Sequence, residues 1–311
     1  MTTALSHYLE IVRDNLRISP SEEREVFNEL KTHIEDRLQE LKEAGLSEEE
    51  ATETCLGLLG SAKMIARQIY EAHSQGTWRQ AMLASMPHLL FATLFALNWW
   101  HHIGWLSVIV TLILGTAIYG WWHGKPAWVF SWLGYSLLPV AVVGLLLIYL
   151  PKGLSWVSVA VYIPLTLWWL YYIIDQTVRR DWLFGSSILL PIPIIAGWLL
   201  AIEPQNQFSE YSMQRVHDFA PWIALSFLAL ALTIATFIRL RQRWLRAVLL
   251  TISGLLILTL IAFYTDGRLG LPAFALLVLA TGGLFLIPAL LERRIRSGGQ
   301  KFKSSLSNLS Y

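Results

Sequence analysis

Cysteine and charge are both scarce in this chain, and each scarcity excludes a class of protein. Cys55 is the single cysteine among 311 residues, so neither an internal disulfide framework nor a cysteine-based metal cluster can hold the fold together. Charged residues make up only 15% of the chain and hydrophobic residues 55%, with a mean hydropathy of +0.48. This composition excludes an ordinary cytosolic enzyme.

The motifs that carry catalysis or nucleotide binding are also missing. The sequence contains no Walker-type phosphate loop, no nucleophile-elbow serine, no HExxH pair and no Rossmann glycine pattern. The two halves of the chain show no convincing internal repeat, so an inverted-repeat transporter is unsupported. We therefore expect a protein that is not an enzyme and that holds no cofactor.

The charges that are present divide the chain into two parts. Residues 1–79 carry 15 acidic and 9 basic side chains, net −6, and the other 232 residues carry 7 and 15, net +8. From residue 82 onward, apolar stretches of about 18 to 23 residues recur, each long enough to cross a hydrocarbon core of about 30 Å. We predict a transmembrane domain over residues 82–291 with eight helices, near 82–100, 104–122, 127–150, 153–174, 183–202, 220–238, 246–264 and 270–291.

Basic residues between these spans predict their orientation, because Lys and Arg are retained on the cytoplasmic side during insertion. One set of alternate connections, together with the basic tail at 292–311, carries 12 of them. The opposite set carries only Lys152, Arg215 and Arg268. We therefore expect both termini in the cytoplasm.

Two features of the spans bear on transport. No ionisable group is expected at mid-depth, which argues against an ion-coupled transporter. Prolines do lie within the spans, and the pair Pro191 and Pro193 predicts that the fifth span is broken.

Histidines are weak candidates for chemistry. His88 and His123 are expected near the inner surface on adjacent spans, and His101 and His102 lie together at the outer one. Paired imidazoles can hold haem or a metal, but neither pair has a spacing motif or accompanying carboxylates. We predict no metal site.

Residues 1–76 are expected to form a small cytoplasmic domain of four helices, which makes the protein all-α. The breaks are a Ser-Pro-Ser step at residues 19–21, Gly45 before a capping box of Ser47 and Glu50, and Gly60 before Ser61. Over residues 70–83 the fourth helix is expected to continue into the first span almost without a break. The predicted core is Leu5, Leu9, Val12, Leu16, Phe27, Leu30, Ile34, Leu38, Leu41, Ala51, Cys55, Leu58, Ala62, Ile65, Ile69 and Ala72.

Residues 29–51, followed by residues 56–69, resemble the bacterial module called permease prefix domain 1 and the similar HAAS signalling domain. The shared pattern is a helix with an acidic and basic run, a glycine, a serine-led capping box, a short helix, and a glycine before an Ile-Ala helix. The resemblance covers about 70 of the 311 residues. Matching positions are Glu29, Leu30, His33, Ile34, Glu35, Asp36, Arg37, Leu41, Gly45, Ser47, Glu49, Ala51, Leu56, Gly60, Ile65 and Ala66.

The resemblance implies two settings. Such prefixes precede ABC-type permeases of the macrolide-exporter kind, or membrane helices in signalling proteins often paired with a PadR-type transcriptional regulator. The permeases place a large extracytoplasmic domain after their first span, whereas here only residues 101–104 separate the first two predicted spans. The signalling arrangement, in the bacterial inner membrane, therefore fits better.

The acidic surface of the N-terminal domain is the predicted partner site, with Glu22, Glu25, Glu48, Glu49 and Glu53 as its residues. It can be a solvated helix face or a docking surface for a basic cytoplasmic partner, a regulator or an ATPase. Its charge repels phosphates, so no direct nucleic-acid binding is expected.

The sequence leaves three functions open. The first is a non-enzymatic membrane protein that senses an envelope condition or anchors a regulator. The second is a divergent permease or transport subunit for a neutral or hydrophobic solute. The third is a membrane subunit of an enzyme complex.

Overall fold

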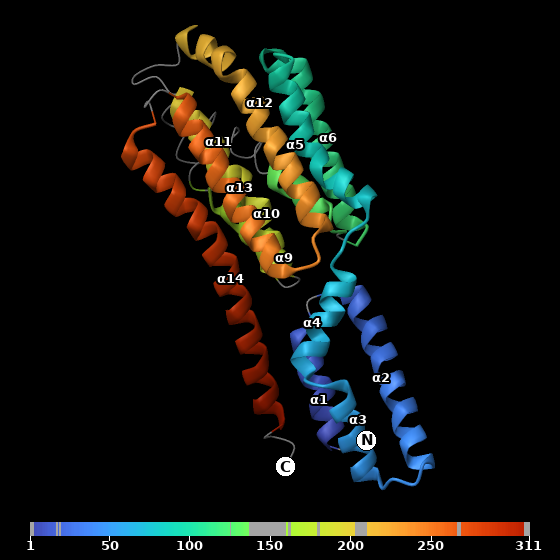
Figure 1. The fold of residues 1–311 in the computed structure, drawn as a ribbon. Helices are drawn as coiled ribbons and strands as arrows, with labels where there is room; N and C mark the ends of the chain where they lie inside the picture. The colour runs from blue at the N-terminus through green and yellow to red at the C-terminus, as the bar shows by residue number, and fades with distance from the viewer. Residues whose placement is uncertain are drawn as a thin grey trace. The chain divides into compact units, whose positions relative to one another are not determined.

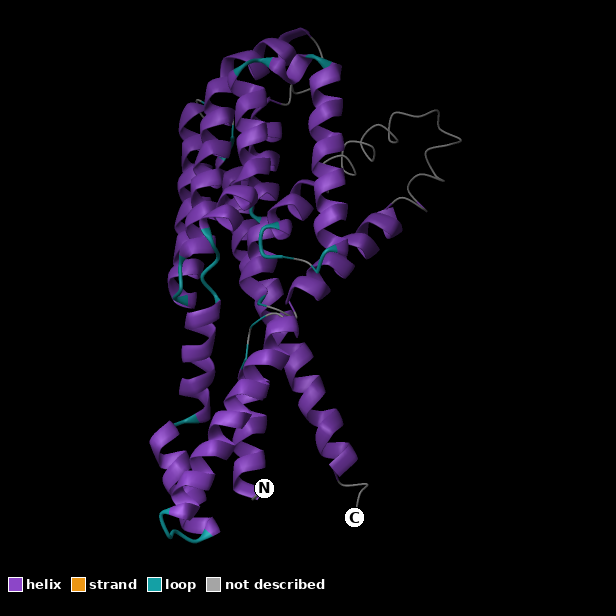
Figure 2. Ribbon diagram, turned by 90° about the vertical axis from the view of Figure 1, so that its right-hand side faces the viewer, coloured by secondary structure: helices purple, strands orange, loops and turns teal. Residues whose placement is uncertain are grey.

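The structure is a computed structural model in which every regular element is a helix in the part that it describes (Figures 1 and 2). This confirms the all-α class. The chain divides into two compact units, residues 1–75 with 298–311 and residues 76–297. The described residues are 3–16, 18, 20–124, 126–136, 160, 163–178, 181–202, 210–265 and 269–307.

The N-terminal unit contains α1 (Thr3–Asn15), α2 (Pro20–Glu43), α3 (Glu48–Leu59) and α4 (Ala62–His73). Gly45 has φ +94°, a left-handed conformation that favours glycine, and it ends the turn after α2. The predicted capping box is present, because the Glu50 N–H donates to Ser47 Oγ at 3.3 Å and the Ser47 N–H donates to Glu50 Oε2 at 3.0 Å. The hydrogen bonds from Ser47 lower the pKa of the Glu50 carboxyl.

The core of this unit follows the predicted apolar stripes, with two corrections. Leu5, Leu9, Val12 and Leu16 of the α1 stripe are all buried, as expected. Leu58 is wrongly predicted as core, since its side chain is 65% exposed. The buried residues of α3 are Ala51, Thr52 and Cys55, and Leu59 is partly buried against the same core, so Leu58 lies outside the buried face. Ala72 is likewise exposed near the end of α4.

Cys55 gives a direct measure of the stability of this core. Its side chain is buried and burial raises the pKa of its thiol, so both the thiolate and access to it are suppressed in the folded unit. We expect iodoacetamide at pH 8 to alkylate Cys55 at least about a hundredfold more slowly in the native protein than in denaturant. The rate should be followed by intact mass; equal rates in the two states would show that α3 does not bury this residue.

The junction between α4 and α5 (Trp78–Ala96) is not a continuous rod, so the expected near-continuity is wrong. α4 ends at His73, and residues 74–77 are not helical. Thr77 then begins α5 with a second capping box, since its Oγ1 accepts from the Gln80 N–H at 3.2 Å and its own N–H donates to Gln80 Oε1 at 3.0 Å.

Five helices of the second unit are long and apolar enough to cross a membrane, and they match five of the eight predicted spans. α5 occupies the first predicted span but is not one of the five. Residues 137–150 of the span predicted at 127–150, and residues 153–159 and 161–162 of the one at 153–174, lie outside the described residues. The described parts of these two spans include helical residues 129–136 and most of α9 (Ile163–Val178). The five candidates are Ile103–Trp122, Trp182–Ile202, Gln214–Arg239, Arg243–Tyr264 and Leu271–Glu292.

Two helices of the second unit extend beyond the limits of their predicted spans. α12 begins ten residues before the predicted span, and α14 continues from its span into the basic tail. The remaining helices of the second unit are α6 (Ile103–Trp122), α10 (Trp182–Leu189), α11 (Pro191–Ile202), α12 (Glu210–Arg239), α13 (Arg243–Tyr264) and α14 (Leu271–Ser307), with a 3-10 turn at Trp99–His101.

The fifth predicted span is interrupted, as the proline pair predicts. α10 ends at Leu189 and α11 begins at Pro191, with Leu190 between them. Leu190 keeps helical angles, φ −56° and ψ −37°, so the hydrogen-bonded helix is broken while the chain continues in nearly the same direction.

α5 packs closely along α12, and the two helices are antiparallel (Figure 1). Small residues let the two backbones approach each other. Ala81 and Ala84 of α5 and Ala224 of α12 are all buried. At one end the Gly76 N–H donates to the Ile238 carbonyl at 2.9 Å, and Arg239 Nη1 donates to the Gly76 carbonyl at 2.9 Å. A Cβ on Gly76 would lie 2.5 Å from the Ile238 side chain, so this approach requires glycine.

Two prolines inside helices free carbonyls that other helices satisfy. Pro87 has no N–H, which leaves the Leu83 carbonyl of α5 without its helical donor; Trp132 Nε1 donates to it at 2.8 Å. Pro288 of α14 frees the Leu284 carbonyl in the same way, and Ser186 Oγ donates to it at 3.3 Å. These contacts join helices through backbone groups that lipid could not hydrate.

Replacing Trp132 by phenylalanine is expected to lower the free energy of unfolding by about 1–2 kcal/mol, because the Leu83 carbonyl loses its donor. Thermal unfolding in detergent measures the change. In the background of Pro87→Ala the helix regains an N–H at position 87, so Trp132→Phe should then cost clearly less. An identical cost in both backgrounds would mean that only the packing of the indole matters.

Candidate functional site

The predicted partner site lies on the surface of the N-terminal unit. Glu25, Glu48, Glu49 and Glu53 are all exposed, and the side chain of Glu22 lies outside the described residues. Glu48 pairs with Lys42 at 3.6 Å, a surface contact worth little. The exposure is what a docking surface needs, and docking itself stays a prediction.

Three of the four histidine candidates are exposed. The rings of His101 and His102 lie 4.0 Å apart at the start of α6. The ring of His123 stacks on Tyr119 at 4.0 Å, and its Nδ1 lies 2.8 Å from the Tyr119 carbonyl. Within the described ranges, no group of three or more His, Cys, Asp or Glu could hold a metal ion.

His88 differs from the other three histidine candidates in its burial. It lies near the centre of α5, and it is only 1% exposed. A titratable side chain is therefore buried midway along this helix. Such residues in membrane helices commonly mark functional sites.

Tyr135 is the nearest polar neighbour of His88. The two ring centroids are 4.9 Å apart with the planes at 86°, and Tyr135 is fully buried. Both imidazole nitrogens and the Tyr135 hydroxyl lack a hydrogen-bond partner in the described part of the chain; the carbonyls of Ala84 and Ser85 lie near the imidazole but without hydrogen-bond geometry. Leaving such groups unpaired in an apolar interior costs free energy.

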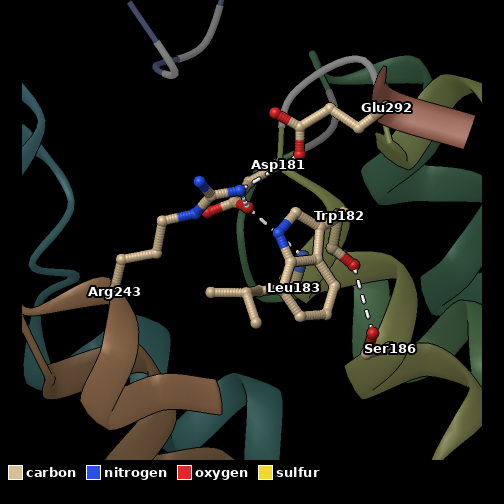
Figure 3. A network of polar contacts seen from close by, with 6 residues as sticks. All are labelled: Asp181, Trp182, Leu183, Ser186, Arg243 and Glu292. Atoms are coloured by element: carbon tan, nitrogen blue, oxygen red, sulfur yellow. Dashed lines mark hydrogen bonds and ion pairs between the residues drawn. The ribbon is translucent and has the colours of Figure 1, made fainter. Parts of the chain in front are cut away.

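An ion cluster joins α10, α13 and α14 at one end of the second unit (Figure 3). Arg243 Nη2 lies 3.0 Å from Asp181 Oδ1 and 3.0 Å from Glu292 Oε2. Asp181 is fully buried and also caps α10, since its Oδ1 accepts from the Leu183 N–H at 3.2 Å. Asp181, Arg243 and Glu292 belong to three connections that the positive-inside rule predicts on the same side of the membrane. These three connections therefore meet at the Arg243 guanidinium.

An apolar pocket of about 280 Å³ lies between α5, α6, α11 and α12. Phe91, Phe227, Trp100 and Trp198 are among its lining residues. Both indoles use their N–H elsewhere, Trp198 on Ser226 Oγ at 3.2 Å and Trp100 on Asn98 Oδ1 at 3.4 Å. The pocket suits a hydrocarbon group and gives an ion nothing to bind.

No protein-family model matches the chain, and no curated protein or solved structure is significantly similar to it. The class of protein is therefore defined by the fold. It is an all-helical protein with at least five helices long and apolar enough to cross a membrane, consistent with a multi-pass membrane protein.

Proposed function

We propose that the chain is a non-enzymatic protein of the bacterial inner membrane that crosses it eight times, with both termini in the cytoplasm. Its N-terminal helical unit binds a protein partner, and its membrane unit anchors that unit or senses an envelope condition. A PadR-type regulator is the partner that the resemblance of residues 29–69 suggests. The supporting observation is a compact acidic unit with a hydrophobic core of its own and an exposed face around Glu25, Glu48, Glu49 and Glu53.

Affinity purification from native membranes tests the partner. We compare the triple variant Glu48→Gln, Glu49→Gln, Glu53→Gln with a control that removes three exposed charges from α2: Glu29→Gln, Glu35→Gln, Glu43→Gln. Glu50 stays, because it closes the capping box.

The first triple variant should recover about tenfold less partner, and added salt should weaken wild-type binding. Equal losses from both triples would show that only net charge matters. The absence of any specific partner would overturn the proposal.

Orientation is tested with a single reporter cysteine. In a Cys55→Ser background, Glu25→Cys places an exposed thiol on the N-terminal unit. A membrane-impermeant maleimide should label it only after the cells are broken. Labelling on intact cells would place this unit outside and contradict the cytoplasmic assignment.

Transport of a neutral, hydrophobic solute is the second candidate function, and the apolar pocket favours it. Purified protein reconstituted in vesicles should then exchange such a solute faster than empty vesicles. Filling the pocket with Ile223→Trp should abolish the difference, because Ile223 lines it.

A further inference from the structure

We propose that His88 and Tyr135 form a hydrogen-bonding site for the carbonyl group of a neutral, lipid-soluble molecule whose apolar body occupies the pocket between α5, α6, α11 and α12. This goes beyond the proposed function and does not depend on it. A partner could bind the N-terminal unit whether or not this site is filled.

The pair is an exception among the polar groups around it. Ser85 Oγ donates to the Met82 carbonyl at 2.9 Å, Ser136 Oγ to the Leu133 carbonyl at 2.7 Å, and Trp132 Nε1 to the Leu83 carbonyl at 2.8 Å. Each of these neighbours uses a carbonyl within reach. By contrast, neither nitrogen of His88 has a hydrogen-bond partner, and neither does the Tyr135 hydroxyl, although both side chains are almost fully buried. Buried polar groups are normally paired, so these atoms point to a ligand.

The hydrogen-bond donors of His88 and Tyr135 determine which polar group a ligand needs in order to bind here. A neutral imidazole has one N–H to donate, and a tyrosine hydroxyl has one O–H. A carbonyl oxygen can accept two hydrogen bonds, one from each residue, without carrying charge. A charged group would be unfavourable here, because the pair is buried and the apolar rings of Phe91 and Phe227 pack against Tyr135.

The pocket supplies room for the apolar body. Phe91 stacks on Tyr135 with ring centroids 4.9 Å apart, and Phe227 lies 6.2 Å from the same ring. Both phenylalanines also line the pocket, so they form the wall between it and the polar pair. For a ligand in the pocket to reach the pair, the half-buried Phe91 side chain has to turn aside. The aromatic walls favour a flat ring beside the carbonyl.

Binding of decylubiquinone to the full-length protein in detergent tests the proposal. Fluorescence titration should show saturable binding at one site. Tyr135→Phe keeps the ring and removes only the hydroxyl, so it should raise Kd about tenfold. His88→Phe should act similarly, and His88→Gln, which retains an N–H donor, should recover part of the affinity.

Decylbenzene is the matched probe, since it lacks a carbonyl. It should bind wild type, Tyr135→Phe and His88→Phe equally, whereas Ile223→Trp should block both probes by filling the pocket. Absence of saturable decylubiquinone binding to wild type would overturn the proposal, as would an unchanged Kd in Tyr135→Phe.

Unliganded stability provides an independent readout. Removing a hydroxyl that has no partner should leave Tm unchanged or raise it. A clear fall in the Tm of ligand-free Tyr135→Phe would show that the hydroxyl is paired within the protein, and the proposal would then be wrong.

Discussion

Replacing Arg243 by methionine should destabilise the helical unit of residues 76–297 by about 3–5 kcal/mol, the cost of breaking a buried ion pair. Arg243 is the cation between Asp181 and Glu292, whose side chains are 0% and 7% exposed. Methionine removes the guanidinium and leaves two negative charges buried close together. Thermal and denaturant unfolding of the detergent-solubilised protein would measure the loss.

A neighbouring arginine supplies the control for this change. Arg241 is exposed in the same connection, so Arg241→Met should change stability by no more than about 0.5 kcal/mol. Adding Asp181→Asn and Glu292→Gln to Arg243→Met should restore much of the loss, because the two buried negative charges near position 243 are then removed. If Arg243→Met and Arg241→Met behave alike, the cluster does not stabilise the fold.

Local signals in the sequence were sufficient for much of this fold. The capping box of Ser47 and Glu50 depends on residues three apart, and the interruption near Leu190 depends on the prolines beside it. Hydropathy identified five membrane-length helices for the same reason, since each apolar run is continuous. The α4–α5 junction carried a comparable signal in Thr77 and Gln80, which was missed because, apart from Gly76, no glycine-rich or proline-rich linker marks a break there.

The sites depend on contacts between distant residues, which a single sequence does not reveal. Arg243 lies 62 residues from Asp181 and 49 from Glu292 along the chain. The positive-inside rule accounts for a basic residue at position 243 without naming a partner. His88 and Tyr135 likewise come from separate helical segments, and only their packing shows that both are buried.

Gly134→Val should cost about 3 kcal/mol or more, because this glycine is where the segment of residues 129–136 crosses α10. A Cβ on Gly134 would lie 2.6 Å from the backbone oxygen of Ile188. Backbone cannot rotate away as a side chain can, so the two helical segments must separate. Gly115→Val is the control, since Gly115 is also in a helix but nothing lies within 4 Å of its added Cβ.

Both substitutions introduce the same β-branched residue into a helix, so the difference between their unfolding free energies isolates the packing at Ile188. Equal costs would show that the close approach is not required.

Gly134→Ala extends the test to ligand binding. Tyr135 is the next residue, so moving this segment away from α10 also shifts Tyr135 relative to His88. Affinity for decylubiquinone should therefore fall together with stability in Gly134→Ala, while Gly115→Val should retain both.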